Sequence, residues 1–115
     1  MPSKEIVEWT VVADVRAGIG EVPIYDPDSA ALYWISLFEP SLNRTSWDTN
    51  ETTTWPLPEV GGSYVLLDDQ SGAIVACADG IHHLDFHSGT TTKLVDAPYD
   101  RANYRFNDGR CDARG

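Results

Sequence analysis

Two stretches of similar pattern decide the fold: Tyr25–Trp34 (YDPDSAALYW) and Leu67–Ala76 (LDDQSGAIVA), which start 42 residues apart. Each begins with an apolar or aromatic residue and an aspartate, continues through a polar turn signal, and ends in an apolar run. A third copy opens at Cys111-Asp112, 44 residues after Leu67. A period of about 40 to 45 residues is typical of the four-stranded blades of a β-propeller.

Outward from these stretches the pattern continues. Trp47-Asp48-Thr49 aligns with Phe86-His87-Ser88 at a spacing of 39 residues, and a run of threonines follows each. Short β-branched and aromatic runs alternate with Gly, Pro, Asp and Ser at intervals of about 8–12 residues, and no helical periodicity of useful length appears. The sequence therefore predicts an all-β chain with strands at Ile6–Val12, Glu21–Tyr25, Ala31–Leu37, Leu42–Trp47, Thr52–Leu57, Ser63–Leu67, Ala73–Ala76, Ile81–Phe86 and Thr90–Val95.

The repeat also predicts how the chain is divided. Residues 18–58 and 59–97 form two complete blades, and 98–115 supply a loop and the inner strand of a third. Residues 1–17 are expected to carry an outer strand that closes the last blade. Because propellers need at least four blades, we expect 1–115 to be the N-terminal part of one propeller domain. Completion by another chain is the alternative.

Composition narrows the class of partner. The formal net charge of −10 argues against nucleic acid and anionic membranes, which both require a basic patch. The N-terminus has no secretory signal, and no run approaches the length of a membrane span. Without such a signal, Cys77 and Cys111 are expected to be reduced thiols, and the protein to be cytoplasmic.

Three polar residues fall at the same position of successive inner strands. The register places Glu21 in the first blade, Ser63 in the second and Asn107 in the third. Because the inner strands of a propeller line one central channel, these side chains are expected to converge there. A carboxylate, a hydroxyl and a carboxamide are hard oxygen ligands, which suit calcium, magnesium or manganese. The plainer interpretation is that Glu21 is solvated at a strand end and Asn107 caps a turn.

Of the other notable residues, one is expected to belong to the binding site and the rest to have structural roles. Arg105 is expected to project in the same direction as Asn107 and to bind a substrate oxygen or pair with a surface acid. His83, Asp85 and His87 alternate on one face of a third-position strand and indicate an exposed polar face, not a metal cluster. Cys111 is expected to be a small core residue. Packing between blades is expected for the aromatic residues Trp34, Trp47, Trp55 and Phe86.

Four motifs together resemble the senescence-marker-protein/gluconolactonase/regucalcin family, in order and over essentially the whole chain. They are Gly20–Asp26 (GEVPIYD), Leu32-Tyr33-Trp34, Trp55–Pro58 (WPLP) and Arg105–Asp112 (RFNDGRCD). Arg-Phe-Asn-Asp-Gly behind Gly-Glu-x-Pro is the most specific element. Two positions depart from the family pattern. Val22 stands where glycine is usual, and Ser36 stands where an aspartate often follows the pair of tryptophan and hydrophobic residue.

The resemblance implies a six-bladed propeller that binds one divalent cation in its channel and hydrolyses sugar lactones. It implies that Glu21 is a metal ligand and that Arg105 and Asn107 contact the substrate. The other ligands and the general base are expected beyond Gly115, so no catalytic residue is assigned to this chain. The metal is expected to be calcium, zinc, manganese, magnesium or iron(II), and the chain alone is expected to be inactive.

Two other functions stay open at this stage. The first is a calcium-binding regulatory propeller without turnover, and the second is an inactive truncated product with exposed blade edges. An asparagine and an aspartate on later inner strands would favour the enzyme. The small-molecule partner expected for the enzyme is a sugar lactone, whose identity the sequence leaves open, as it does the oligomeric state.

Overall fold

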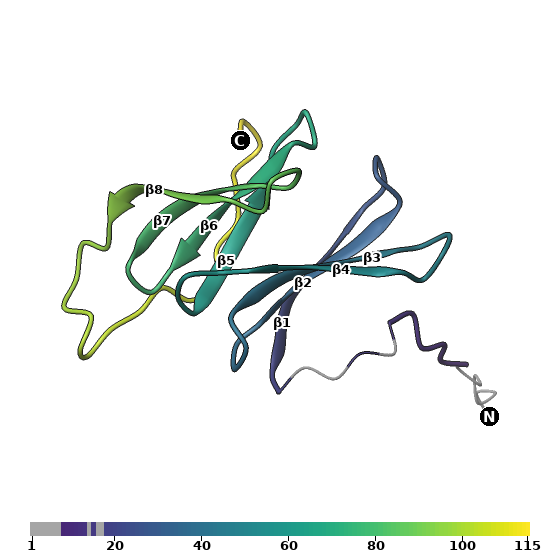
Figure 1. Cartoon of the computed structure of the whole chain (residues 1–115), viewed down its shortest axis with the longest axis horizontal. Helices are drawn as coiled ribbons and strands as arrows, with labels where there is room; N and C mark the ends of the chain where they lie inside the picture. The colour runs from purple at the N-terminus through teal and green to yellow at the C-terminus, as the bar shows by residue number, and fades with distance from the viewer. Residues whose placement is uncertain (1–7, 14, 16–17) are drawn as a thin grey trace, which may run out of the picture.

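The computed structural model describes residues 8–13, 15 and 18–115, which form eight strands in two four-stranded antiparallel sheets (Figure 1). Each sheet is a simple meander in chain order, and no helix occurs in the part of the chain described. The first sheet comprises β1 (Gly20–Asp26), β2 (Ala31–Ser36), β3 (Ser41–Ser46) and β4 (Thr52–Pro56). The second comprises β5 (Gly61–Leu66), β6 (Gly72–Cys77), β7 (Gly80–Asp85) and β8 (Thr91–Asp96).

Eight of the nine predicted strands are confirmed, with ends that move by one or two residues. The exception is Ile6–Val12: residues 6 and 7 lie outside the described residues, and residues 8–12 form no strand. Residues 98–115 form turns and irregular backbone without a strand, so the inner strand of a third blade stays a prediction. Among the described residues no helix could serve as a membrane span.

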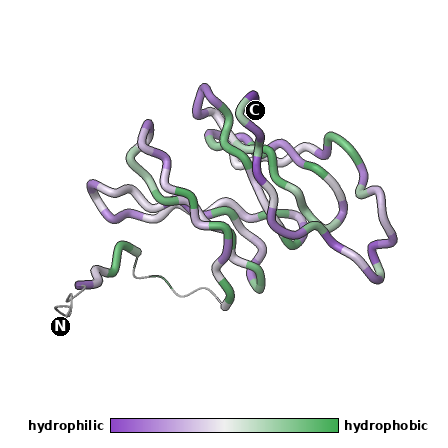
Figure 2. The backbone as a smooth tube through the Cα atoms, turned by 180° about the vertical axis from the view of Figure 1, so that it is seen from behind, coloured by the Kyte–Doolittle hydropathy of each residue, from purple (hydrophilic) through white to green (hydrophobic). Residues whose placement is uncertain are grey.

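Aspartates at the ends of strands shape the turns between them. Asp26 Oδ2 accepts a hydrogen bond from the Ser29 hydroxyl at 2.6 Å, which ties together the β1–β2 turn. Asp85 Oδ1 accepts from the backbone N–H groups of His87 and Ser88, at 2.8 and 3.0 Å. These bonds favour the ionised carboxylate and lower the pKa of Asp85. Hydrophilic colour accordingly gathers at the strand tips in Figure 2.

The core lies between the two sheets. Because side chains alternate along a strand, each sheet turns one set of apolar residues toward the other. Ile35 and Leu42 of the first sheet and Val75 and Leu84 of the second are fully buried in one cluster. Gly61 lets the sheets approach closely, since an added Cβ would lie 3.0 Å from Leu57 and 3.2 Å from Ile35.

An aromatic stack closes the outer half of this interface. The rings of Trp55 and Phe86 lie 4.3 Å apart between centroids with a 21° interplanar angle, and Trp55 Nε1 donates to the Phe86 carbonyl at 3.1 Å. Tyr33, from the same face of the first sheet, also stacks against Phe86, with ring centroids 5.9 Å apart. The predicted packing of Trp55 and Phe86 between blades is confirmed.

The same prediction is wrong for Trp47. Its side chain is 53% exposed and packs edge-on against Tyr25 of its own sheet, 5.6 Å away. The Trp47 N–H still donates to the Ala30 carbonyl, as the N–H of its counterpart Phe86 donates to the Ser71 carbonyl. The two rings differ because Phe86 packs on the first sheet, whereas Trp47 packs beside Tyr25. Trp34 is buried on the face of β2 opposite Tyr33, beside Val12 and Val15, so it makes no contact in the core between the sheets.

The expected core position of Cys111 is also wrong. Cys111 is exposed, because its segment has no strand partner, whereas Cys77 at the end of β6 is fully buried. Burial raises the pKa of the Cys77 thiol to about 12. The two free thiols therefore lie in opposite environments.

We predict that substituting Tyr64→Phe destabilises the fold, because the Tyr64 hydroxyl donates to the buried Val22 carbonyl of the first sheet at 2.8 Å. An unsatisfied buried acceptor costs about 1–3 kcal/mol, which urea unfolding would measure. Tyr25→Phe is the matched control, since Tyr25 is 48% exposed, and its effect should stay below about 0.5 kcal/mol. Equal stability of both variants and the parent would contradict the inter-sheet role of Tyr64.

We further predict that iodoacetamide at pH 8 alkylates Cys111 in the native protein but spares Cys77. The thiolate is the reactive form, and burial both excludes the reagent from Cys77 and disfavours that form. Peptide mass spectrometry before and after urea treatment would show Cys77 modified only on unfolding. Rapid native labelling of Cys77 would show that the two sheets do not stay packed.

Candidate functional site

The site begins where the inner strands of the two sheets meet. β1 and β5 contact each other, and the hydrogen bond from Tyr64 to the Val22 carbonyl joins them 42 residues apart in the chain. This spacing equals the sequence repeat, so the register predicted from the repeat holds at the inner edge. Glu21 and Ser63, at equivalent positions of the repeat, lie on these neighbouring strands.

Glu21 lies at a distortion of β1. It pairs with Ile35, and the register then shifts between Glu21 and Ile24. Within this bulge Val22 has a φ of 53°, a left-handed conformation that β-branched residues rarely adopt. The resemblance noted in the sequence analysis implies glycine at this position. Burial of the Val22 side chain and the bond from Tyr64 hold the strained backbone in place.

The carboxylate of Glu21 is only half-buried. The residue lines a hollow of about 420 Å³ together with Val12, Pro23, Leu32 and Trp34. This hollow lies on the face of the first sheet away from the second. Glu21 thus has apolar surroundings, and its carboxylate has no hydrogen-bond or ion-pair partner among the described residues, which leaves its oxygens available to a ligand.

The third expected contributor comes from the segment after β8, which runs along β5 in Figure 1. A Cβ added to Gly62 would lie 2.4 Å from the Phe106 carbonyl oxygen, and one added to Gly109 would lie 3.2 Å from Ser63 Oγ. Segment 106–109 therefore lies directly against the start of β5. The absence of a side chain at Gly62 is what allows this close approach.

Tyr99 anchors this segment to the second sheet. Its hydroxyl donates to the Ala78 carbonyl at 2.9 Å and accepts from the Phe106 N–H at 3.0 Å. The rings of Tyr99 and Phe106 meet edge-on at 5.1 Å. Irregular backbone is thus held in a defined position without belonging to a sheet.

Arg105 and Asn107 flank Phe106 and are both exposed. Neither side chain has a hydrogen-bond or ion-pair partner within the described part of the chain, whereas the neighbouring Arg110 pairs with Asp108 at 2.8 Å. The guanidinium of Arg105 is therefore free to bind an oxygen of another molecule. Pairing of Arg105 with a surface acid, the alternative raised by the sequence, is not observed.

The arrangement can contribute part of a metal site. No three His, Cys, Asp or Glu side chains gather into a possible metal cluster among the described residues. Glu21, Ser63 and Asn107 offer one carboxylate and two neutral oxygens, donors that suit a hard divalent cation. A tight site of this kind takes six to eight oxygen ligands for calcium, so these residues fit as one portion of a larger set.

Two features were not found from sequence. Tyr64 follows Ser63 directly and joins the inner strands, and burial raises its pKa far above the usual range. The signal in the sequence was the aromatic Tyr64 directly after Ser63, one of the three positions expected to face the channel. His82 is buried and bonds Asp79 through Nε2 at 2.7 Å, while His83 is half-buried and His87 exposed.

Comparison with known proteins gives a consistent result. Residues 19–115 match the family model described as "SMP-30/Gluconolactonase/LRE-like region". An L-arabinolactonase of Azospirillum brasilense is 34% identical over 92% of this chain, and a 6-deoxy-6-sulfogluconolactonase of Pseudomonas putida is 35% identical over 84%. The matched regions span about 35% and 33% of those two proteins.

A solved structure shares the fold. A calcium-binding protein, regucalcin, from Agrobacterium tumefaciens superposes with a TM-score of 0.69 at 25% identity, covering 76% of this chain and 29% of that one. The predicted all-β propeller class is confirmed, and the two four-stranded sheets are blades.

We predict that Gly62→Ala displaces segment 105–109, because the new Cβ would collide with the Phe106 carbonyl. Hydrogen exchange of peptides covering 105–109 should accelerate, with a loss of stability of about 1–3 kcal/mol. Gly109→Ala is the matched control, since its Cβ would meet only the rotatable Ser63 hydroxyl at 3.2 Å. Unchanged exchange in Gly62→Ala would mean that the segment does not rest on β5.

Proposed function

The chain belongs to the SMP-30/gluconolactonase/LRE-like family, and we propose that it supplies two blades and part of the active site of a metal-dependent sugar-lactone hydrolase. The observation that carries this proposal is the family match, together with Glu21 on β1 and the segment of Asn107 resting on β5, the inner strand that contacts β1. The two relatives named as lactonases support the reaction class. The substrate class proposed is an aldonolactone.

Each candidate residue receives a role that suits its surroundings. Glu21, with unpartnered oxygens beside an apolar hollow, is proposed as a metal ligand. Arg105 donates hydrogen bonds from its free guanidinium to substrate oxygens. Asn107 offers both a donor and an acceptor, which suits the hydroxyl groups of a sugar. No catalytic base is assigned within 1–115; the base is proposed to lie beyond residue 115.

A bound divalent cation supplies Lewis-acid polarisation of an ester carbonyl and acidifies water. The part played by this chain is positioning. Segment 105–109, held by Tyr99 and Gly62, keeps Arg105 and Asn107 on the inner edge of the second blade. Fixing the substrate against the blade in this way lowers the entropic part of the barrier.

The metal is proposed to be one of calcium, zinc, manganese, magnesium or iron(II). The oxygen donors of this chain favour the harder ions of that group. The similar structure from Agrobacterium is described as calcium-binding, which supports calcium as the first candidate. A six-bladed assembly, a cytoplasmic location, and the absence of nucleic-acid and membrane partners belong to the same proposal.

A second candidate is a calcium-binding regulator that does not turn over a lactone, which the similarity to regucalcin favours. An inactive truncated chain is the third. Metal binding without hydrolysis would favour the regulator, and loss of both would favour the inactive chain. Both properties are accessible in the same preparation of the complete protein.

We predict that lactone hydrolysis by the complete protein requires added divalent metal and falls at least about 100-fold in Glu21→Gln and in Asn107→Ala. The Gln side chain keeps its size but loses the charge that binds the cation. Glu51→Gln, at an exposed turn, is the control and should keep full activity. Hydrolysis of L-arabinono- and gluconolactones across a metal series gives the readout.

Calorimetric metal titration separates loss of metal binding from loss of substrate binding as the cause of reduced hydrolysis. In Glu21→Gln the apparent metal affinity should fall together with activity, whereas Asn107→Ala should mainly raise KM. If hydrolysis survives Glu21→Gln at saturating metal, the assignment of Glu21 as a metal ligand is wrong.

A further inference from the structure

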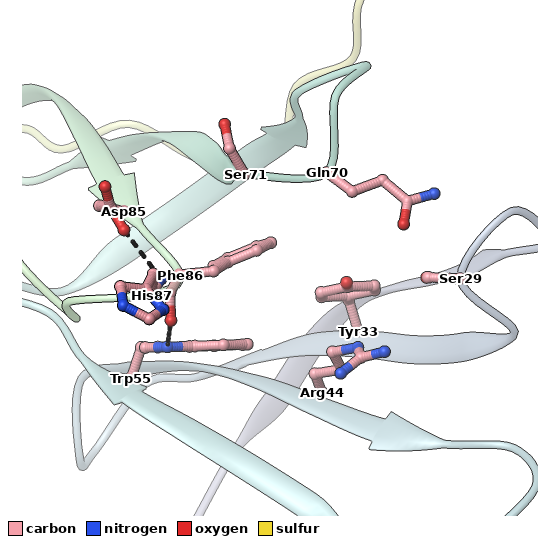
Figure 3. A pocket seen from close by; sticks show the side chains of 9 residues that line it. All are labelled: Ser29, Tyr33, Arg44, Trp55, Gln70, Ser71, Asp85, Phe86 and His87. Carbon is pink, nitrogen blue, oxygen red and sulfur yellow. Dashed lines mark hydrogen bonds between the residues drawn. The ribbon is translucent and has the colours of Figure 1, made fainter.

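We propose that the groove between the two blades holds a second ligand site, for a small hydroxylated monocarboxylate bound by Arg44. The groove has a volume of about 400 Å³, in the range of small-molecule sites. It opens between β3 and β4 of the first blade and the β5–β6 and β7–β8 turns of the second (Figure 3). Glu21, Arg105 and Asn107 do not line it, so this inference is independent of the proposed function.

The strongest indication is an unsatisfied donor on a permanent cation. Arg44 sits in β3 opposite Tyr33 of β2 and Thr53 of β4. Its Nε is buried and has no hydrogen-bond partner, and Arg44 forms no ion pair among the described residues. A guanidinium stays charged at any physiological pH, and a buried donor left unpaired is costly. An acceptor is therefore expected to bind the guanidinium from the groove, through its exposed Nη groups.

The unpartnered edge determines the chemistry of that acceptor. The two Nη groups of Arg44 are not enclosed, and the end of a guanidinium that they form matches the two oxygens of a carboxylate. In Figure 3 the head of Arg44 lies beside the Tyr33 ring on one side of the groove. Tyr33, Phe86 and Trp55 form a continuous apolar wall, and a low-dielectric wall strengthens an ion pair formed next to it.

The opposite side of the groove excludes a second negative charge. Asp85 lies there, and two backbone N–H groups hold its carboxylate in the ionised form. It would repel a second acid group and accept a hydrogen bond from a ligand hydroxyl. Gln70 and Ser71 from the β5–β6 turn add neutral hydrogen-bonding groups beside it. One cation, one anion and several neutral groups together suit a ligand with one carboxylate and several hydroxyls.

Gluconate is a probe of this class, with glucitol as its uncharged counterpart and glucarate as its dicarboxylate. Calorimetry in EDTA, which removes divalent metal, should show gluconate binding at least about tenfold more tightly than either counterpart. Arg44→Met, which keeps the length of the stem, should weaken gluconate at least about tenfold. Arg101→Met, at an exposed ion pair with Glu59, and Glu21→Gln should leave it unchanged.

A second variant, which removes the negative charge of Asp85, keeps the proposal testable if Arg44→Met misfolds. Asp85→Asn removes the repulsive wall, so glucarate should bind that variant about as tightly as gluconate. The proposal is overturned if gluconate does not bind the parent protein, if glucitol binds equally well, or if a folded Arg44→Met retains full affinity. Loss of binding in Glu21→Gln would place the ligand at the inner edge and would also overturn it.

Discussion

Burial of one blade face against the next is the constraint on which the rest of this structure depends. Each four-stranded sheet carries apolar residues on both faces, so an isolated sheet cannot bury its apolar side chains. The shared core of Ile35, Leu42, Val75 and Leu84 buries one face of each sheet against the other. The interface also brings β1 and β5 together, and every candidate site residue lies on or beside one of these two strands.

Fine positioning comes from a few polar and steric details at the inner edge. The Tyr64 hydroxyl ties β5 to the strained Val22 carbonyl next to Glu21. Gly62 then admits the backbone of Phe106, which carries Arg105 and Asn107 on either side. Strain at Val22 is consistent with a functional position, because such conformations persist where the surrounding structure enforces them. The blade core thus supports the site through contacts that simple hydrophobic packing does not supply.

The sequence predicted eight of the strands and the meander because turn aspartates and apolar runs are local signals. It also placed Glu21 and Ser63 on adjacent strands, since a repeat of 42 residues carries its register with it. It failed for Trp47 and Cys111, whose burial depends on which neighbour packs against them. The groove at Arg44 escaped prediction because its residues come from five separate segments of the chain, which only the packing of the two blades brings together.

The most direct test of the central claim is a crystal structure of the complete protein soaked with Mn²⁺, with the ion located by its anomalous signal. The account predicts one strong peak at the inner edge of the blades, with a Glu21 carboxylate oxygen at a coordination distance of about 2.0–2.6 Å. Asn107 should face the same opening. A peak bound only by other residues, with Glu21 directed elsewhere, would contradict it.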